Sequence, residues 1–207
     1  MKKNAGRRLA GLSLTAVLLL SSFTACQSKT AGTELTKVTL NEVAHSIFYA
    51  PQYAAIELGY FKDEGIDLTL VNGAGADKVM TALVSGDADI GFMGSEASIY
   101  TYAGGSEDYA VNFAQLTQRA GNFLVARQPD DHFTWDKLKG TKVLGGRAGG
   151  MPQMVFEYIL KKNGIDPKLD LTIDQSISFG LTAAAFTSDD SDYTVEFEPF
   201  ATGLELE

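Results

Sequence analysis

Strand-length apolar runs alternate with helical patterns along this chain, and that alternation constrains its fold more than any other feature. Ile66, Leu68 and Leu70 alternate with polar residues at the two-residue period of a strand. The apolar residues of 76–84 then recur at i, i+3, i+4, i+7 and i+8, which places them on one helical face. Gly86 is expected to end this helix, because glycine enters the left-handed conformation without strain. This order of elements predicts an α/β fold with mainly parallel sheets.

The same alternation returns in the second half of the chain, so we expect two units of comparable build, the second beginning near Trp135. Residues 109–127, between the units, hold two apolar runs that we interpret as a connecting hairpin. Glu198-Pro199 is expected to open a last helix. The other predicted elements are strands over 38–43, 88–92, 142–144 and 169–173 and helices over 94–102 and 151–160.

The first 25 residues carry basic side chains but no acidic one, and 9–20 form an apolar stretch. Twelve helical residues span about 18 Å, short of the roughly 30 Å hydrocarbon core of a bilayer, so this stretch is typical of an export signal. Thr24 and Ala25 directly precede Cys26, an arrangement that resembles the lipobox of bacterial lipoproteins. We expect a lipoprotein signal peptide over 1–25 and a membrane anchor through lipidated Cys26. An ordinary signal peptide with Cys26 near the cut stays open.

Charge and composition exclude several classes of protein. The 207 residues contain 17 Lys+Arg and 26 Asp+Glu, which gives a net charge of −9. Removal of 1–25 takes away four basic residues, so the remaining chain has 13 basic and 26 acidic residues and a net charge of −13. Such an acidic chain is not expected to bind nucleic acid, which normally meets a basic face. The single cysteine excludes a disulfide framework, and the two histidines, His45 and His132, have no third partner at metal-ligand spacing. We therefore expect no metal site and no cofactor.

A glycine-rich stretch at 145–150 is the strongest candidate ligand loop. It lacks the ending of a P-loop, but it follows a predicted strand, and Pro152 suits the first turn of the next helix. In open α/β sheets, ligands bind at the carboxyl ends of strands. We expect Gly149, Gly150 and Met151 to offer backbone N–H groups to a negative ligand group, and Arg147 to add a charge-assisted bond. A tight turn with a solvated arginine is the alternative.

Polar and aromatic residues follow the predicted strand ends of the first unit. An aromatic wall with a few polar groups is typical of a small-molecule pocket, although ordinary packing would explain each aromatic residue taken singly. The candidates are Ser46, Phe48 and Tyr49 after the first strand, Ser95 and Glu96 after the third, and Gln115 and Gln118 on the connecting segment.

Four stretches resemble the extracytoplasmic solute-binding proteins of ABC importers, of the nitrate/sulfonate/taurine and thiamine-pyrimidine-precursor type. They are FYAPQYAA at 48–55, GYFKDEGID at 59–67, ALVSGDADIG at 82–91 and LKG at 138–140. Together with the lipobox, the similarity covers nearly the whole chain, and the combination is specific for the family but not for a ligand.

The resemblance implies a type II periplasmic-binding-protein fold, in which two lobes of mainly parallel sheet close on a ligand by hinge motion. Tyr49 departs from the pyrimidine-precursor members, which often have a histidine at about this position. Carried over by position, the cleft involves Ser46, Tyr49, Ser95, Gln115, Arg147, Gly150 and Glu198.

The resemblance also divides the chain. Residues 26–36 are expected to form a tether, 37–126 the first lobe with the connecting hairpin, and 127–207 the second lobe. Family members run well beyond this C-terminus and cross back to the first lobe, so we expect the second lobe here to be incomplete.

The expected function is that of a substrate-binding lipoprotein on the extracytoplasmic face of the cell membrane. It would capture a small organic or oxyanion solute, such as a sulfonate, nitrate, taurine or a pyrimidine, and deliver it to an ABC permease and its ATPase. The sequence contains no Gly-x-Ser-x-Gly motif, so a nucleophile elbow is unsupported. The export signal and the lack of a downstream Cys cluster argue against an enzyme, and catalysis is not expected. A pyrimidine-synthase-like enzyme of the same fold and a ligand-sensing lipoprotein remain alternatives.

Overall fold

The computed structural model describes residues 34–119, 121–178 and 180–206. The expected signal peptide, Cys26 and most of the tether lie outside the described residues. The helices and strands considered below all belong to one compact unit, Leu35–Glu207. Within the described part of the chain, no helix has both the length and the apolar character that crossing a membrane requires.

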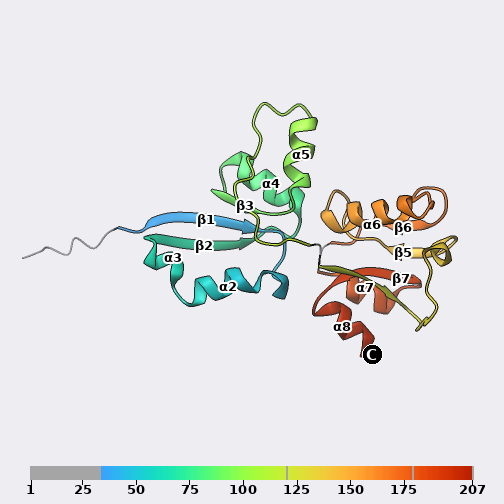
Figure 1. Ribbon diagram of the computed structural model, residues 1–207. Coiled ribbons are helices and arrows are strands. Elements are labelled where there is room, and N and C mark those ends of the chain that lie inside the picture. The colour runs from blue at the N-terminus through green and yellow to red at the C-terminus, as the bar shows by residue number, and fades with distance from the viewer. Residues whose placement is uncertain (1–33, 120, 179, 207) are drawn as a thin grey trace, which may run out of the picture. The chain divides into compact units, whose positions relative to one another are not determined.

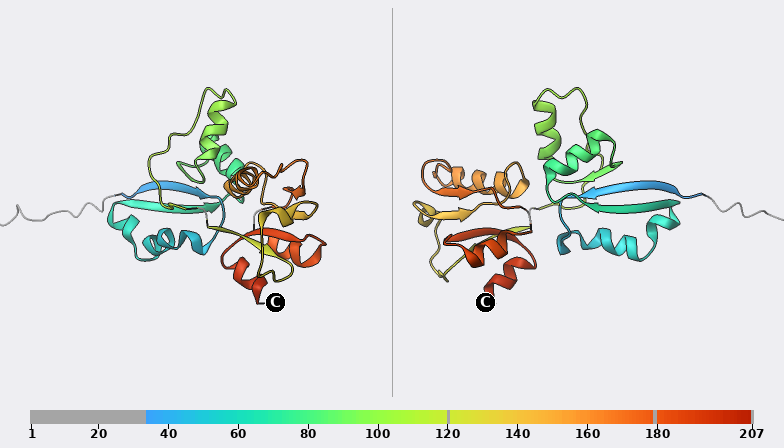
Figure 2. Two further views of the ribbon diagram at one scale, coloured as in Figure 1. Left: turned by 45° about the vertical axis from the view of Figure 1, so that its right-hand side comes forward. Right: turned by 180° about the vertical axis from the view of Figure 1, so that it is seen from behind.

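The first sheet is built from three parallel strands in the order β2-β1-β3. Helices lie on both of its faces, with α2 and α3 on one side and α4 and α5 on the other (Figures 1 and 2). This arrangement confirms the parallel sheet that the alternating pattern predicts. The strands are β1 (Thr36–Glu42), β2 (Ile66–Asn72) and β3 (Ile90–Phe92), and the helices are α2 (Ala50–Glu57), α3 (Tyr60–Asp63), α4 (Ala76–Ser85) and α5 (Glu96–Ala103), with a 3-10 turn η1 (Ile47–Tyr49) before α2.

Helix α4 follows the predicted apolar face closely. Ala76 and Met80 are buried, and they pack with Ala97 of α5 in the core of the first lobe. Gly86 ends the helix in the left-handed conformation, with φ of 81°, as its position after the last apolar residue predicts. The helix is therefore held by its buried face and stopped by its C-terminal glycine.

The second sheet has four strands in the order β4-β7-β5-β6. β5 pairs parallel with both of its neighbours, whereas β4 pairs antiparallel with β7. The strands are β4 (Asn122–Ala126), β5 (Lys142–Leu144), β6 (Thr172–Asp174) and β7 (Tyr193–Phe197), accompanied by the 3-10 turn η2 (Trp135–Leu138) and the helices α6 (Met151–Lys162), α7 (Thr182–Ser188) and α8 (Phe200–Glu205).

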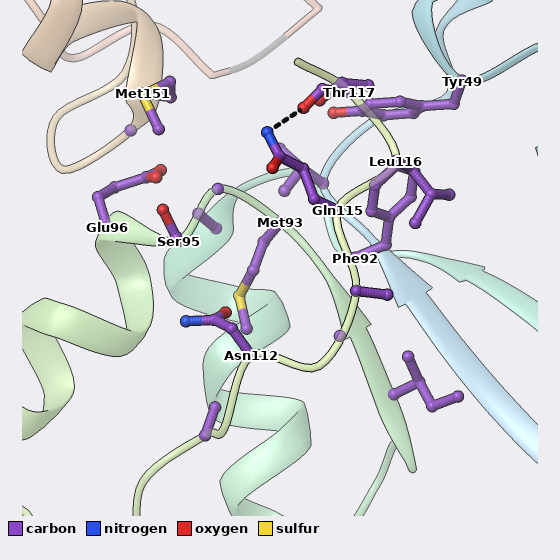
Figure 3. Close-up of a pocket in the computed structure, with 18 of the residues that line it drawn as sticks. Tyr49, Phe92, Met93, Ser95, Glu96, Asn112, Gln115, Leu116, Thr117 and Met151 are labelled. Carbon is purple, nitrogen blue, oxygen red and sulfur yellow. Dashed lines mark hydrogen bonds between the residues drawn. The ribbon is translucent and has the colours of Figure 1, made fainter. Parts of the chain in front are cut away.

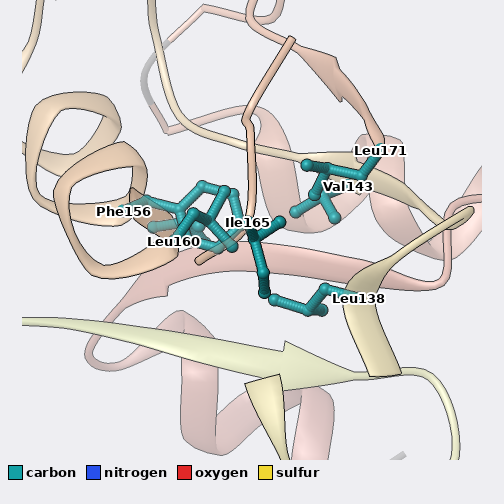
Figure 4. Packing of buried hydrophobic residues seen from close by; sticks show 7 residues of the cluster. Leu138, Val143, Phe156, Leu160, Ile165 and Leu171 are labelled. Carbon is teal, nitrogen blue, oxygen red and sulfur yellow. The ribbon is translucent and has the colours of Figure 1, made fainter. Parts of the chain in front are cut away.

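The core of the second lobe lies between α6 and its sheet (Figure 4). Leu160 and Val143 are fully buried, and Phe156 is nearly so. These side chains come from the helical face and the short strand that the sequence predicts. The remaining buried members of the cluster are Leu138, Ile165, Leu171 and Val195.

The predicted connecting hairpin over 109–127 is wrong. Residues 109–119 contain no strand among those described, and β4 pairs with β7 rather than with its sequence neighbour. Leu124 lies opposite Val195 in this pairing, so β4 belongs to the second sheet and the chain enters the second lobe before residue 126. The hairpin interpretation failed because 109–119 supply no strand, and the antiparallel partner of β4 is β7, near the end of the chain.

The predicted strand over 169–173 forms only at its end, because β6 begins at Thr172. Asp166 and Asp170 close a turn instead: the Asp170 N–H donates to the Asp166 carbonyl at 2.9 Å, and the Asp166 N–H donates to the Asp170 carboxylate at 2.7 Å. Leu169 is consequently exposed. The last helix, α8, is present as expected, whereas α7 and β7 have no counterpart among the predicted elements.

Candidate functional site

A cleft of about 1340 Å³ lies at the carboxyl ends of β3 and β5, between residues of both lobes. Its walls come from the turn η1, the start of α5, the segment 108–119 and the loop 147–152. Parallel strands bring their carboxyl ends to one edge, which is why loops distant in sequence share this space. Figure 3 shows the part of the cleft around Tyr49, Glu96 and Met151.

Most of the sequence-predicted site residues line this cleft. Ser46 and Glu198 do not: the Ser46 hydroxyl donates to the Glu198 carbonyl at 3.4 Å, and Ser46 lines a separate cavity of about 130 Å³. The residues that the structure brings together in the cleft are Phe48, Tyr49, Ser95, Glu96, Gln115, Gln118, Arg147, Gly149, Gly150 and Met151.

The aromatic wall is formed by the turn that follows β1 together with Phe92 at the end of β3. The rings of Tyr49 and Phe92 lie 4.4 Å apart, and Phe48 is 5.5 Å from Tyr49. Ser46 caps the turn by accepting the Phe48 N–H at 3.2 Å, so a local sequence signal stabilises the backbone turn that carries Phe48 and Tyr49. Gly121 passes so close to the Phe48 ring that a Cβ there would lie 2.6 Å from it.

The hydroxyl of Tyr49 stays protonated at physiological pH. Burial, reinforced by the negative charges of Glu42 and Glu96, raises the pKa of Tyr49 to about 12. The cleft therefore presents a neutral phenol that can donate or accept a hydrogen bond.

Arg147 is paired with the protein's own Asp77. Its Nε and Nη2 donate to the two Asp77 carboxylate oxygens at 3.1 and 2.7 Å. This bond is the main cause of the lowered pKa of Asp77. Arg147 lies in the cleft as the sequence predicts, but its guanidinium is directed at an acidic residue in the first turn of α4.

The backbone N–H groups expected to receive a negative ligand group are also engaged. The Gly149 N–H donates to Oε1 of Gln153 at 2.7 Å, and the Gly150 N–H donates to the Arg147 carbonyl at 3.1 Å. The Met151 N–H lies close enough to the carboxylate of Glu96 to favour its charged form. The expectation of free N–H groups is therefore wrong for Gly149 and Gly150, because the Gln153 side chain and the turn itself satisfy them.

Glu96 is the most deeply buried acidic residue of the cleft, with 2% of its surface exposed. Burial raises its pKa, while its own N–H and the Met151 N–H oppose that rise by favouring the charged form. Its Oε2 atom has no hydrogen-bond partner in the described part of the chain. The carboxylate lies directly against Gly94, where any Cβ would overlap with it.

A buried carboxylate that sequence reasoning missed holds the turn of the aromatic wall. Glu42, 1% exposed at the end of β1, accepts hydrogen bonds from Gln52 Nε2 and Tyr53 Oη, both at 2.9 Å. It also lies 3.0 Å from Nδ1 of His45, whose ring stacks on Tyr53 at 4.4 Å. An acidic residue inside the predicted strand over 38–43 was the available signal.

The segment 108–119 carries the predicted Gln115 and Gln118 and adds cleft residues that the sequence did not single out, among them Asn112 and Arg119. Asn112 donates to the Ser98 hydroxyl at 2.8 Å, and Gln115 donates to the Thr117 carbonyl at 2.9 Å. Arg119 adds an exposed positive charge to the wall. Within the ranges that the structure describes, no group of three or more His, Cys, Asp or Glu side chains could hold a metal ion.

Comparison with known proteins identifies a protein family and a relative that this chain resembles. The family model described as NMT1/THI5 like matches residues 47–198. "Putative binding protein YtlA" of Bacillus subtilis (strain 168) is 48% identical over 198 residues, which are 96% of this chain and 58% of that protein.

Solved structures have the same fold. A structure from Bordetella bronchiseptica RB50 matches with a TM-score of 0.65 and 25% identity, over 84% of this chain and 54% of that one. The periplasmic aliphatic sulphonate binding protein SsuA from Escherichia coli matches with a TM-score of 0.56 and 18% identity, over 83% and 57%. The alkanesulfonate-binding protein SsuA from Xanthomonas axonopodis pv. citri, bound to MOPS, matches with a TM-score of 0.58 and 19% identity, over 84% of this chain and 58% of that one.

The chain thus spans just over half the length of the relatives it matches. The family match covers most of the residues from the aromatic turn to the start of the last helix, including nearly all of the cleft. The fold is that of the periplasmic binding proteins. By the match over residues 47–198, this chain belongs to the NMT1/THI5-like family.

Proposed function

We propose that this chain is the extracytoplasmic solute-binding component of an ABC importer. It captures a small organic or oxyanion solute in the cleft between its lobes and delivers it to a permease and its ATPase. The observation that carries the proposal is the cleft itself, where an aromatic wall from one lobe faces a glycine loop from the other. YtlA is named a binding protein, and the two SsuA proteins are named for binding sulphonates.

The dimensions of the cleft support solute capture by closure. Its volume of about 1340 Å³ exceeds the roughly 300–1,000 Å³ of small-molecule pockets, so a small solute would fill it only after the lobes approach. Hinge closure around a ligand is the usual motion of two-lobed binding proteins. The closed form would be the one that a permease recognises.

Lipidation of Cys26 would keep such a receptor beside its permease. Several acyl chains, each contributing about 0.8 kcal/mol per buried CH₂, give firm attachment to a bilayer. The Cys26→Ser change removes the thiol that would be lipidated, so it should release the protein in soluble form. Retention of the variant in the membrane fraction would contradict the lipid anchor.

A ligand panel tests the receptor function directly. The full chain is heated with nitrate, taurine, other sulfonates, pyrimidines or flavins, and the unfolding temperature is followed by fluorescence. A true ligand at a hundredfold excess over its Kd adds about 2.7 kcal/mol of stability. Tyr49→Ala should abolish the shift, whereas Tyr60→Ala, on an exposed tyrosine outside the cleft, should keep it. The proposal fails if no compound raises the unfolding temperature.

A further inference from the structure

The start of α6 already holds a negative charge. An anionic solute group at the N–H groups of 149–151 would meet the carboxylate of Glu96, which lies close enough to the Met151 N–H for that N–H to favour its charged form. Figure 3 shows this carboxylate at the head of α5, directed toward Met151. Helix N-termini favour a negative group, and here the protein supplies that group itself.

One oxygen of this carboxylate is left without a donor. Oε2 of Glu96 is shielded from solvent and has no hydrogen-bond partner among the residues that the structure describes. Buried polar atoms are normally paired, and an unpaired charged oxygen destabilises the state that contains it. A donor brought by the solute would remove that deficit.

The charges of the cleft favour a donor that is positive. Asp77, Asp89, Glu96 and Asp108 line it on the acidic side, against Arg119 and Arg147 on the basic side. Since Asp77 and Arg147 neutralise one another, the remaining side chains carry an excess of negative charge.

The aromatic wall suits the same kind of group. Tyr49 and Phe92 line the same cleft as Glu96, and the charge of Glu96 is among the causes of the raised pKa of Tyr49. A cationic nitrogen is attracted to the face of such rings as well as to a carboxylate.

We infer that Glu96 contacts the solute and that the solute presents a nitrogen-bound proton, of an amine or ammonium group, to Oε2. The inference rests on the proposed solute-binding function and names the chemistry of its ligand. Glu96 replaces the N–H groups of 149–151 as the main polar determinant of the ligand.

The test compares solutes that differ only at the nitrogen. Taurine is paired with isethionate, in which a hydroxyl replaces the amine, and 4-amino-2-methylpyrimidine is paired with 2,4-dimethylpyrimidine. Binding to the full chain is measured by calorimetry. We expect the amino member of at least one pair to bind about tenfold or more tightly than its partner, as a charge-assisted hydrogen bond allows.

Variants assign that preference to one carboxylate. Glu96→Gln should reduce the affinity for the amino member by about tenfold or more and leave its partner unchanged. Glu57→Gln makes the same chemical change on an exposed residue outside the cleft and should behave as the native chain. If Glu96→Gln fails to fold, Glu96→Asp, which keeps the charge but retracts it, should give a smaller loss.

The outcomes separate the two proposals. Equal binding of both members of a pair to the native chain would overturn the role of Glu96 and leave the receptor function standing. Tighter binding of isethionate to Glu96→Gln than to the native chain would also overturn it, because the carboxylate would then only repel an anion. Failure of all four compounds to bind would overturn the receptor function for these solutes and the inference with it.

Discussion

The guanidinium of Arg147 holds both carboxylate oxygens of Asp77, at 3.1 Å from Nε and 2.7 Å from Nη2. A loop of the second lobe is thereby tied to the first turn of α4 in the first lobe. The residue that the sequence offered for an anionic solute group is instead part of a link between lobes, and Asp77→Asn separates the two roles.

Asp77→Asn should free Arg147 for an anion. We expect a higher affinity for isethionate, measured by calorimetry, because the guanidinium loses its competing carboxylate. The cost in unfolding free energy should stay below about 1 kcal/mol, since the Asp77 side chain is 55% exposed. An unchanged affinity would show that Arg147 does not reach the solute. Asp190→Asn, which disrupts an exposed pair with Lys142, is the matched control.

The same pair should weaken in acid. Arg147 lowers the pKa of Asp77 below its ordinary value of 3.8 in the folded chain. The pair therefore contributes stability that is fully present above pH 3.8 and is lost as the pH falls through the lowered value. Urea unfolding should show that the difference in unfolding free energy between the native chain and Asp77→Asn becomes smaller as the pH falls through that acidic range.

Glu96 should give the opposite dependence on pH. Burial raises its pKa above the ordinary value of 4.5, so the folded state binds its proton more tightly than the unfolded state. The stability of the unliganded chain should therefore decline as the pH rises from about 4.5 through the raised pKa. Glu96→Gln removes this titration, so the variant should gain stability relative to the native chain over that window in urea unfolding. Glu57→Gln should show no such gain, and a difference that is independent of pH would contradict the raised pKa.

Glu42 should be important for stability because three neighbours depend on it. Glu42→Gln removes the charge that accepts from Gln52 and Tyr53 and leaves a buried amide with a donor to satisfy. We expect a loss of about 1–3 kcal/mol in unfolding free energy, as for other buried hydrogen-bond partners. Glu64→Gln, on an exposed residue, should change stability by less than about 0.5 kcal/mol. Equal stability of the two variants would contradict the network.

Gly94 should be coupled to Glu96. A Cβ at Gly94 would overlap with the Glu96 carboxylate, so Gly94→Ala should destabilise the chain by about 1–3 kcal/mol. In a Glu96→Ala background the same change should cost less, because the obstructing carboxylate is gone. Gly203→Ala, which meets nothing within 4 Å, is the control and should be neutral or stabilising. Additive effects of the two changes would rule out the close approach.

Local pattern was enough to predict the elements that hold the cleft. Residues close together in the sequence predict the apolar face of α4, its end at Gly86 and the proline in the first turn of α6. The structure confirms each of these features. Because parallel strands end at a common edge, the same reasoning placed every candidate residue except Ser46 and Glu198 in the cleft.

The amino-acid sequence by itself thus determined the α/β class, the two-unit order and the loops that follow the strands at the cleft, but not the course of the segment 109–119. Tertiary structure alone decided the pairing of β4 with β7 and the contacts of Arg147 and Glu96. Asp77 and Arg147 are 70 residues apart, so no local spacing relates them. The pairing of donors with acceptors depends on how side chains of the two lobes are directed in the folded chain. Here the carboxylates of Asp77 and Glu96 lie at the groups that were expected to bind an anionic solute.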